Sequence, residues 1–297
     1  MKLVFLGCGA SARAHARRLR GRVELGFASR EPARAAAFAR ELGGTAYDSY
    51  EAALAAAVDA VVIATPPATH LPLALAALAA GKHVVLDKPA LAAVAEFAAV
   101  EAAAAAAGRR VFVAENYRYK PVLARLQQLL AERVVGDVVL IAVNAVKHQV
   151  SHGWRADEPA LHEGGIHWVD FMAALGEIRS ARGVRAGEPE RSTVVTFAYA
   201  GGAIGTLAHS WEVPSLARGL RLSKIYGRAG TITFESNGLW VLCRGTKTRF
   251  YVPDVRDLGG HRAMWSDFLA AWRDGTEPRM TLALARRDQE LIEEAYR

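Results

Sequence analysis

The chain has 297 residues, which exceeds the usual size of one domain, so we expect two domains, residues 1–118 and 119–297. Its formal charge of +7 comes mostly from scattered arginines, without a nucleic-acid-binding motif, so no nucleic acid is expected as a partner. The longest alanine-rich stretch, 91–107, is interrupted by Glu96 and Glu101, so no membrane-spanning segment is predicted.

Short apolar runs alternate with alanine-rich amphipathic stretches over residues 1–115. This alternation is typical of consecutive βαβ units around a parallel sheet. The predicted strands are 3–6, 23–28, 60–64, 83–86 and 111–114, and the predicted helices are 11–19, 31–42, 49–57, 70–80 and 91–107. The sequence therefore predicts an α/β domain of the doubly wound Rossmann type.

The pattern changes beyond Pro121. A helix is predicted over 122–132 and a strand over 137–146, followed by an irregular stretch rich in His, Trp and Gly. Five further apolar runs, separated by glycine-containing turns, favour an open, mainly antiparallel sheet: 192–200, 205–211, 220–226, 231–235 and 239–244. Two closing helices, 262–273 and 282–296, complete a predicted α+β domain.

The first strand ends in the fingerprint G-x-G-x-x-A, read as Gly7, Cys8, Gly9, Ala10, Ser11 and Ala12. Glycines at this turn let backbone amides approach a pyrophosphate at the N-terminus of the following helix. The alternative is a tight turn without a ligand.

The second strand ends in Ser29 and Arg30, where a fold that prefers NAD usually carries an acidic residue. Arg30 can pair with a 2′-phosphate, so NADP is the preferred cofactor and NAD the alternative. The other interpretation is that Arg30 is a solvated loop arginine that binds no cofactor.

Residues 59–89 carry the most specific signal in the chain. They contain Ala64-Thr65-Pro66-Pro67, Thr69-His70, Ala80-Gly81-Lys82-His83-Val84 and Asp87-Lys88-Pro89. With these motifs the chain resembles the glucose–fructose oxidoreductase/inositol dehydrogenase/rhizopine-catabolism (Gfo/Idh/MocA) family of NAD(P)-dependent oxidoreductases. The resemblance covers nearly the whole chain and weakens between about Arg179 and Arg262.

The resemblance implies roles for several residues. The loop Thr65, Pro66 and Pro67, with His70 and Asp87, would lie along the cofactor, and Lys88 would reach the reacting centre. Asn116 would touch the nicotinamide, and Tyr117 and Arg118 the substrate.

Two motifs depart from the family pattern. Asp87 replaces the usual glutamate before Lys88, and Glu163 stands where the family has its catalytic aspartate in D-x-G-x-H-x-x-D. The glycine pair that precedes this motif in the family is also missing, since Pro159 and Ala160 stand there.

Oxidation of an alcohol needs a base that takes the hydroxyl proton while hydride leaves the carbon. A cationic nicotinamide disfavours a nearby ammonium, which suits Lys88 to this task, and histidine titrates near neutral pH, which suits His167. Glu163 precedes His167 by four residues and shares a face with it if the segment is helical. We assign Lys88 and His167 to proton transfer and Glu163 to a supporting role. The alternatives are that Lys88 is an ordinary surface lysine and that His167 is a buried structural histidine.

The substrate pocket is expected between the domains. His152, Trp154, Arg155 and Trp211 are further candidates for its lining, although aromatic residues at such spacing often belong to a core. His148, His152, His162 and His167 match no zinc motif, and no metal is predicted.

The leading hypothesis is an oxidoreductase that transfers hydride between NAD(P) and a sugar, cyclitol or related polyol. Alternatives within the resemblance are a glycosidase that uses bound NAD for transient oxidation, and a non-catalytic dinucleotide-binding regulator. Lys88 argues against the regulator, whereas the change to Glu163 favours it.

The resemblance also implies a homodimer or homotetramer. The short apolar run after Met1 does not resemble a signal peptide, and Cys8 and Cys243 cannot form a disulfide framework, so a cytoplasmic protein is expected.

Overall fold

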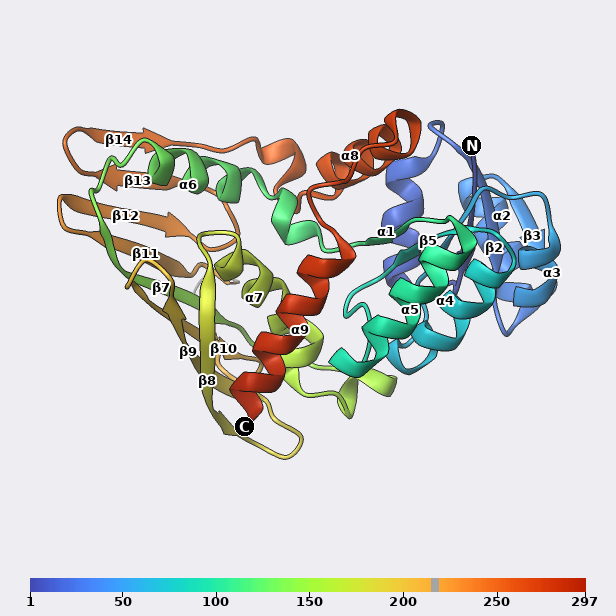
Figure 1. The fold of residues 1–297 in the computed structure, drawn as a ribbon, viewed down its shortest axis with the longest axis horizontal. Helices are drawn as coiled ribbons and strands as arrows, with labels where there is room; N and C mark the ends of the chain where they lie inside the picture. The colour runs from blue at the N-terminus through green and yellow to red at the C-terminus, as the bar shows by residue number, and fades with distance from the viewer. Residues whose placement is uncertain (215–218) are drawn as a thin grey trace. The chain divides into compact units, whose positions relative to one another are not determined.

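The computed structural model describes residues 1–214 and 219–297, which fold as two compact units (Figure 1). Unit 1 consists of Met1–Glu115 and Met264–Arg286. Unit 2 consists of Asn116–Ala263 and Arg287–Arg297.

Unit 1 contains a six-stranded parallel sheet in the order β3-β2-β1-β4-β5-β6. Nearly every residue of the inner strands is buried, as expected for a parallel sheet covered on both faces. The order reverses between β1 and β4, and ligands of open α/β sheets bind at such a switch point. The strands are β1 (Lys2–Leu6), β2 (Glu24–Ala28), β3 (Thr45–Tyr47), β4 (Ala60–Ile63), β5 (His83–Leu86) and β6 (Val111–Val113).

The helices of unit 1 bury small apolar faces against this sheet. In α1 (Ala10–Leu19) the buried residues include Ala12, Ala16 and Leu19, and α4 (His70–Ala79) packs beside α5 (Val94–Ala107) (Figure 1). The Ala92 N–H donates to Glu96 Oε2 just before α5 begins. Unit 1 also contains α2 (Pro32–Leu42), α3 (Tyr50–Ala55), the 3₁₀ turn η1 (Pro67–Thr69) and most of α8 (His261–Asp274).

Unit 2 is built on an eight-stranded sheet in the order β14-β13-β12-β11-β7-β10-β9-β8. The sheet is mixed, because β7 and β10 run parallel while their other neighbours pair antiparallel. The expectation of a mainly antiparallel sheet is therefore met only in part. The strands are β7 (Val138–Val146), β8 (Ile178–Ala186), β9 (Ser192–Tyr199), β10 (Ile204–Ser210), β11 (Leu222–Gly227), β12 (Gly230–Glu235), β13 (Val241–Arg244) and β14 (Thr248–Tyr251).

Helices cover one face of this sheet: α6 (Pro121–Ala131), α7 (Ile166–Ala173) and the end of α9 (Leu282–Tyr296) (Figure 1). Their core includes Leu126, Phe171, Phe197, Phe234 and Ile292. The alternate residues of the strands stay exposed. The expected irregular stretch after Val146 holds the 3₁₀ turn η3 (Gly153–Ala156), the π-helical turn η4 (Leu161–Gly165) and α7. Two other 3₁₀ turns are η2 (Asn116–Tyr119) and η6 (Val255–Asp257).

Within the described ranges, no helix combines the length and apolarity needed to cross a bilayer.

Candidate dinucleotide and substrate sites

The glycine turn after β1 can hold a pyrophosphate. Gly7 has φ of 104°, and a Cβ on it would lie 2.6 Å from the Ala64 carbonyl oxygen, so no other residue fits there without a shift. A Cβ on Gly9 would meet no described atom within 4 Å. The turn therefore has a tight inner side packed on the loop after β4 and an open outer side at the start of α1.

The start of α1 favours an anion. Gly9 is its N-cap residue, and the described helix has neither a side-chain cap nor an acidic residue in its first turn. The first N–H groups of a helix lack intrahelical partners, and the helix dipole adds positive potential there. The arrangement fits the phosphates of a dinucleotide.

The other predicted cofactor residues at the ends of β1 and β2 differ in exposure. Ser29 is buried and its Oγ accepts from the Glu31 N–H at 3.3 Å, whereas Arg30 is exposed at the loop surface. Burial raises the pKa of the Cys8 thiol to about 11, although Arg34 and Arg13 oppose the shift. Cys8 is therefore a neutral thiol, whose Sγ lies 3.7 Å from the Ala28 carbonyl oxygen.

The loop after β4 is fixed by His70. Its ring is fully buried, with Nε2 2.9 Å from the Thr65 carbonyl oxygen and Nδ1 3.0 Å from the Ala90 carbonyl oxygen. Thr69 Oγ1 also donates to the Pro66 carbonyl oxygen at 2.7 Å. Any contribution of His70 to cofactor binding is thus through the shape of the loop that carries Thr65, Pro66 and Pro67.

Asp87 links the end of β5 to the glycine turn. Its carboxylate accepts a hydrogen bond from Ser11 Oγ and another, at 2.9 Å, from the Lys88 N–H. Burial alone would raise the pKa of this carboxyl, but hydrogen bonding and charge from His15, the Ser11 hydroxyl and the Lys88 charge hold it well below its usual value. An ionised Asp87 therefore sets the backbone that presents the half-buried Lys88.

Two residues behind Asp87 were missed by sequence reasoning. His15 Nε2 lies 3.7 Å from Asp87 Oδ1, and its Nδ1 accepts from Trp265 Nε1 at 3.1 Å. The Trp265 bond leaves Nε2 as the protonated nitrogen that faces the carboxylate. A histidine one helical turn beyond Ser11 was the available signal, but its partner on α8 was too remote in sequence to predict.

In unit 2, Glu163 and His167 lie on consecutive turns of η4 and α7. Glu163 is 5% exposed, and Arg155 Nε donates to its Oε1 at 2.9 Å. The His167 ring stacks on Tyr117 with centroids 4.4 Å apart and an interplanar angle of 13°. The π-helical turn at this point is a feature often found at functional sites.

The predicted substrate residue Arg118 is engaged in a buried ion pair. Its Nε donates to Asp170 Oδ1 at 2.7 Å, and Asp170 is fully buried. Asp170 is the last residue of the D-x-G-x-H-x-x-D pattern, and its bond to Arg118 joins η2 to α7, the elements that carry Tyr117 and His167. Asn116 is also engaged, since its Nδ2 donates to the Gly259 carbonyl oxygen at 2.5 Å.

The remaining predicted substrate residues lie on or beside η3. The Arg155 guanidinium lies over the Trp154 ring, 4.7 Å from the centroid, while it also holds Glu163. His152 is exposed. Of the η3 candidates, Arg155 is therefore the one that the structure ties directly to Glu163.

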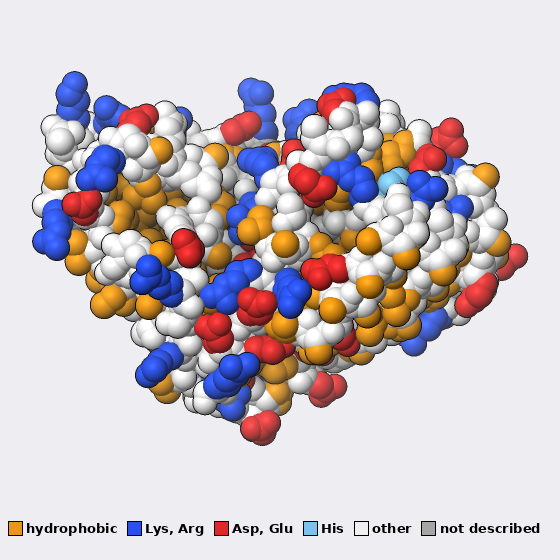
Figure 2. Space-filling model, in the orientation of Figure 1, with side chains coloured by type: hydrophobic (Ala, Val, Ile, Leu, Met, Phe, Trp, Pro, Cys, Tyr) orange, Lys and Arg blue, Asp and Glu red, His pale blue; other side chains and the backbone are white. Residues whose placement is uncertain are grey.

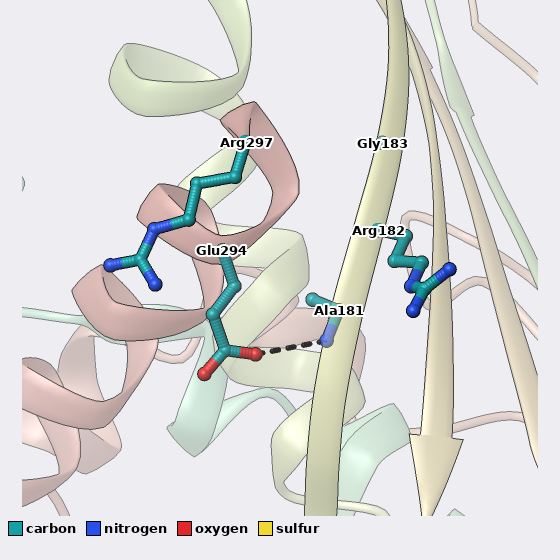
Figure 3. Close-up of a pocket in the computed structure, with 5 residues that line it drawn as sticks. All are labelled: Ala181, Arg182, Gly183, Glu294 and Arg297. Carbon is teal, nitrogen blue, oxygen red and sulfur yellow. Dashed lines mark hydrogen bonds between the residues drawn. The ribbon is translucent and has the colours of Figure 1, made fainter.

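Charged side chains of both signs share one face of the molecule, and one pocket of unit 2 lies outside the candidate sites. On the face drawn in Figure 2, Lys and Arg side chains are interspersed with Asp and Glu. A pocket of about 480 Å³ between β8 and α9 is lined by Ala181, Arg182, Gly183, Glu294 and Arg297, and Glu294 accepts from the Ala181 N–H at 3.0 Å (Figure 3). Residues 1–214 and 219–297 contain no group of three His, Cys, Asp or Glu side chains placed to hold a metal.

These features define a nucleotide-binding oxidoreductase fold. Residues 1–115 match the family model described as "Oxidoreductase family, NAD-binding Rossmann fold", and residues 123–233 match the "GFO/IDH/MocA C-terminal domain". The chain belongs to the Gfo/Idh/MocA family.

Among curated relatives, an uncharacterised oxidoreductase of Escherichia coli is 41% identical over 120 residues, 40% of this chain and 34% of its own length. The D-xylose 1-dehydrogenase (NADP⁺) 2 of Haloferax volcanii is 43% identical over 120 residues, which are 40% of this chain and 37% of the relative. The matched part thus spans about a third of each relative.

Solved structures share the whole fold. An oxidoreductase from Thermotoga maritima has a TM-score of 0.86 at 22% identity, with 100% of this chain and 96% of that chain covered. The UDP-N-acetylglucosamine 3-dehydrogenase of Acidithiobacillus ferrooxidans gives 0.86 at 22% identity, with 100% and 97% covered. The aldose-aldose oxidoreductase of Caulobacter crescentus gives 0.87 at 19%, with 100% and 96% covered. At these identities the likeness concerns the fold.

Proposed function

We propose that the protein is an NAD(P)-dependent dehydrogenase that transfers hydride between nicotinamide and the carbinol carbon of a sugar, cyclitol or related polyol. The observation that carries this proposal is the hydrogen bond from Ser11 to Asp87, which joins the dinucleotide fingerprint to the segment that presents Lys88. Because this bond holds the glycine turn and the Lys88 segment together, it would keep an ionisable side chain at a fixed position beside a bound cofactor.

Different residues of the chain have different roles in the proposed site. Gly7, Gly9 and the first amides of α1 would hold the pyrophosphate, and a bound nicotinamide supplies the acceptor or donor of hydride. Lys88 and His167 are the proposed groups for moving the hydroxyl proton. Glu163, held by Arg155, is proposed to orient His167 or a substrate hydroxyl, and Tyr117 keeps the His167 ring in one plane.

The test is steady-state turnover of the full chain with NAD⁺ and NADP⁺ across a panel of neutral and acidic sugars, polyols and cyclitols. Substrate-dependent formation of reduced dinucleotide, with one carbonyl product per turnover, is the expected result. Hydrolysis of a glycoside without net change of the dinucleotide would instead favour the glycosidase, and dinucleotide binding without turnover the regulator.

NADP is the proposed preferred cofactor, because the exposed Arg30 follows β2 where a carboxylate would repel a 2′-phosphate. The neighbouring carboxylate Glu31 is paired with Arg34 Nε at 2.8 Å. Arg30→Ala is expected to weaken NADP⁺ binding roughly ten- to hundredfold, the range for a hydrogen bond to a charged group, and to change NAD⁺ binding little.

Fluorescence titration of both reduced dinucleotides measures this preference. Arg40→Ala, at the exposed end of α2, is the matched control and should leave both affinities unchanged. Equal losses for the two dinucleotides in Arg30→Ala would contradict a contact with the 2′-phosphate.

We also propose that the open face of the unit 2 sheet binds a second copy of the chain. Val194 is 50% exposed, Ile204 56% and Phe250 62%, and on β9 and β10 the exposed residues alternate with the buried core. Exposed apolar residues gathered on one face are typical of interaction surfaces.

Val194→Glu is expected to convert a wild-type dimer or tetramer into smaller species, because it buries a carboxylate within the proposed interface. Light scattering after size exclusion gives the mass directly. Val255→Glu makes the same change at an exposed valine in η6, outside the sheet, and should leave the mass unchanged. A monomeric wild type would refute the proposed interface.

A further inference from the structure

Two buried side chains lie behind Asp87 in unit 1 and have no assigned role in the proposed chemistry. Asp87 is 8% exposed, His15 3% and Trp265 0%. Buried polar groups are paired in most proteins because burial without a partner is costly. A functional role for His15 and Trp265 therefore requires that their contacts lead to a residue of the site.

The contacts of these two residues lead to Lys88. Trp265 Nε1, on α8, donates to His15 Nδ1 at 3.1 Å. His15 Nε2, on α1, lies 3.7 Å from Asp87 Oδ1, and the same oxygen accepts from the Lys88 N–H at 2.9 Å. Side chains of α1 and α8 are thus connected to the backbone of the proposed proton-transfer residue.

The bond from Trp265 selects the tautomer of His15 that supports Asp87. A neutral imidazole has one N–H, and its other nitrogen accepts. Because Nδ1 accepts from the indole, the proton of His15 lies on Nε2, which faces the carboxylate. The two rings also meet edge to face, with centroids 5.6 Å apart and an interplanar angle of 79°, a packing that limits rotation of the imidazole. An N–H of fixed direction therefore faces Asp87.

The Asp87 carboxylate is engaged at both oxygens. Ser11 Oγ donates to Oδ2, whereas the Lys88 N–H and His15 Nε2 face Oδ1. Ser11 and His15 are four residues apart on α1, so they lie on one face of this helix. Burial alone would raise the pKa of Asp87, but His15, Ser11 and Lys88 hold that pKa well below its usual value. The ionised carboxylate is thereby held in one orientation beneath Lys88.

We propose that His15 and Trp265 are positioning residues that fix Lys88 through Asp87 for proton transfer. The inference rests on the proposed dehydrogenase function. Both residues act through the carboxylate and leave the proton transfer itself to Lys88. Because a displacement of about 1 Å can cost on the order of a hundredfold in rate, loss of either contact should lower kcat more than the affinity for dinucleotide.

Amide hydrogen exchange of the full chain, measured by NMR, tests the positioning without turnover. The probe is the Lys88 N–H, and the reference is the Asp87 N–H, which donates to the Ile63 carbonyl oxygen at 3.0 Å. His15→Leu removes both ring nitrogens, and Trp265→Phe removes the indole N–H. Each should raise the exchange rate of the Lys88 N–H roughly tenfold, the range for a hydrogen bond to a charged group, and change that of Asp87 little.

Steady-state kinetics on the same variants separate kcat from binding. His15→Leu and Trp265→Phe should each lower kcat roughly tenfold and change the dinucleotide Kd at most about twofold. His15→Gln, whose amide offers both a donor and an acceptor, should recover part of the kcat lost in His15→Leu. In an Asp87→Asn background, His15→Leu should cause no further loss, because both changes act on the same carboxylate.

Trp272→Phe is the matched control on α8, because within the described ranges Trp272 Nε1 has no hydrogen-bond partner. It should leave kcat and the exchange of the Lys88 N–H unchanged.

Three results would overturn the proposal. The first is exchange that is unchanged in the His15 and Trp265 variants, or faster for Lys88 and Asp87 alike, since the latter reports a loosened fold. The second is wild-type kcat in those variants, or equal losses of kcat and dinucleotide affinity. The third is a further loss from His15→Leu in the Asp87→Asn background. Selectively faster exchange of the Lys88 N–H in a protein without turnover would contradict the dehydrogenase and still support the positioning of Lys88.

Discussion

Lys88→Ala is expected to lower kcat/KM by about a thousandfold while the affinity for dinucleotide changes only a few-fold. Lys88 follows Asp87, whose carboxylate accepts from the Lys88 N–H and from Ser11. The substitution keeps the Lys88 N–H, Asp87 and Ser11 and removes the lysine side chain beyond Cβ with its ammonium, so a proton-transfer group is lost without loss of the nucleotide turn. Steady-state kinetics and dinucleotide titration on the same preparation measure the two effects separately.

Lys82→Ala is the matched control. Lys82 precedes β5, and its Nζ donates to the Ala56 carbonyl oxygen at 2.8 Å. Lys82→Ala therefore removes a hydrogen-bonded lysine at the opposite end of the strand from Lys88. This variant should retain wild-type kcat. Retention of turnover in Lys88→Ala, or a collapse of dinucleotide binding together with turnover, would assign Lys88 a structural role instead.

Gly7→Ala and Gly9→Ala should separate the packing and ligand roles of the glycine turn. An alanine at residue 7 requires a positive φ and places Cβ 2.6 Å from the Ala64 carbonyl oxygen, so we expect a loss of roughly 1–3 kcal/mol in the free energy of unfolding and a large loss of dinucleotide affinity. Gly9 has ordinary φ and open space, so Gly9→Ala should fold with wild-type stability and still bind dinucleotide weakly.

Denaturant unfolding without ligand and dinucleotide titration give the two readouts. Gly201→Ala, at a turn glycine with no described atom within 4 Å of its Cβ, is the control for the loss of backbone freedom. Wild-type affinity in Gly9→Ala would contradict a pyrophosphate on the open side of the turn.

The first sheet could be predicted closely from sequence because its strands are continuous apolar runs. The strand expected over 83–86 is His83–Leu86, and the others differ by one residue at an end. The missed strand Thr45–Tyr47 is short, lies at the edge of the sheet and is largely exposed, so it lacks the apolar signal.

The second sheet was less predictable. β8 lies at one edge, reads IRSARGVRA and buries only Ile178 and Ala181, so its polar composition hides the strand. β14, at the other edge, pairs on one side only. The parallel pairing of β7 with β10 joins segments far apart in the chain, and alternation of residues alone gives no strand direction.

The candidate sites could also be predicted only in part from the sequence. Local motifs nominate the glycine turn, Lys88, Glu163 and His167 as candidate site residues. The contacts that support them are long-range and could not be inferred from spacing, among them Ser11 with Asp87, His15 with Trp265 and Arg118 with Asp170.

Transfer of deuterium is the most direct test of the central claim. The full chain would be incubated with NADP⁺ or NAD⁺ and each of a set of perdeuterated sugars, polyols and cyclitols, and the dinucleotide and sugar would be recovered for mass spectrometry. The dehydrogenase predicts one deuterium in each reduced nicotinamide and an equal amount of carbonyl product. Deuterium that remains entirely in the sugar, with the dinucleotide still oxidised, would contradict it.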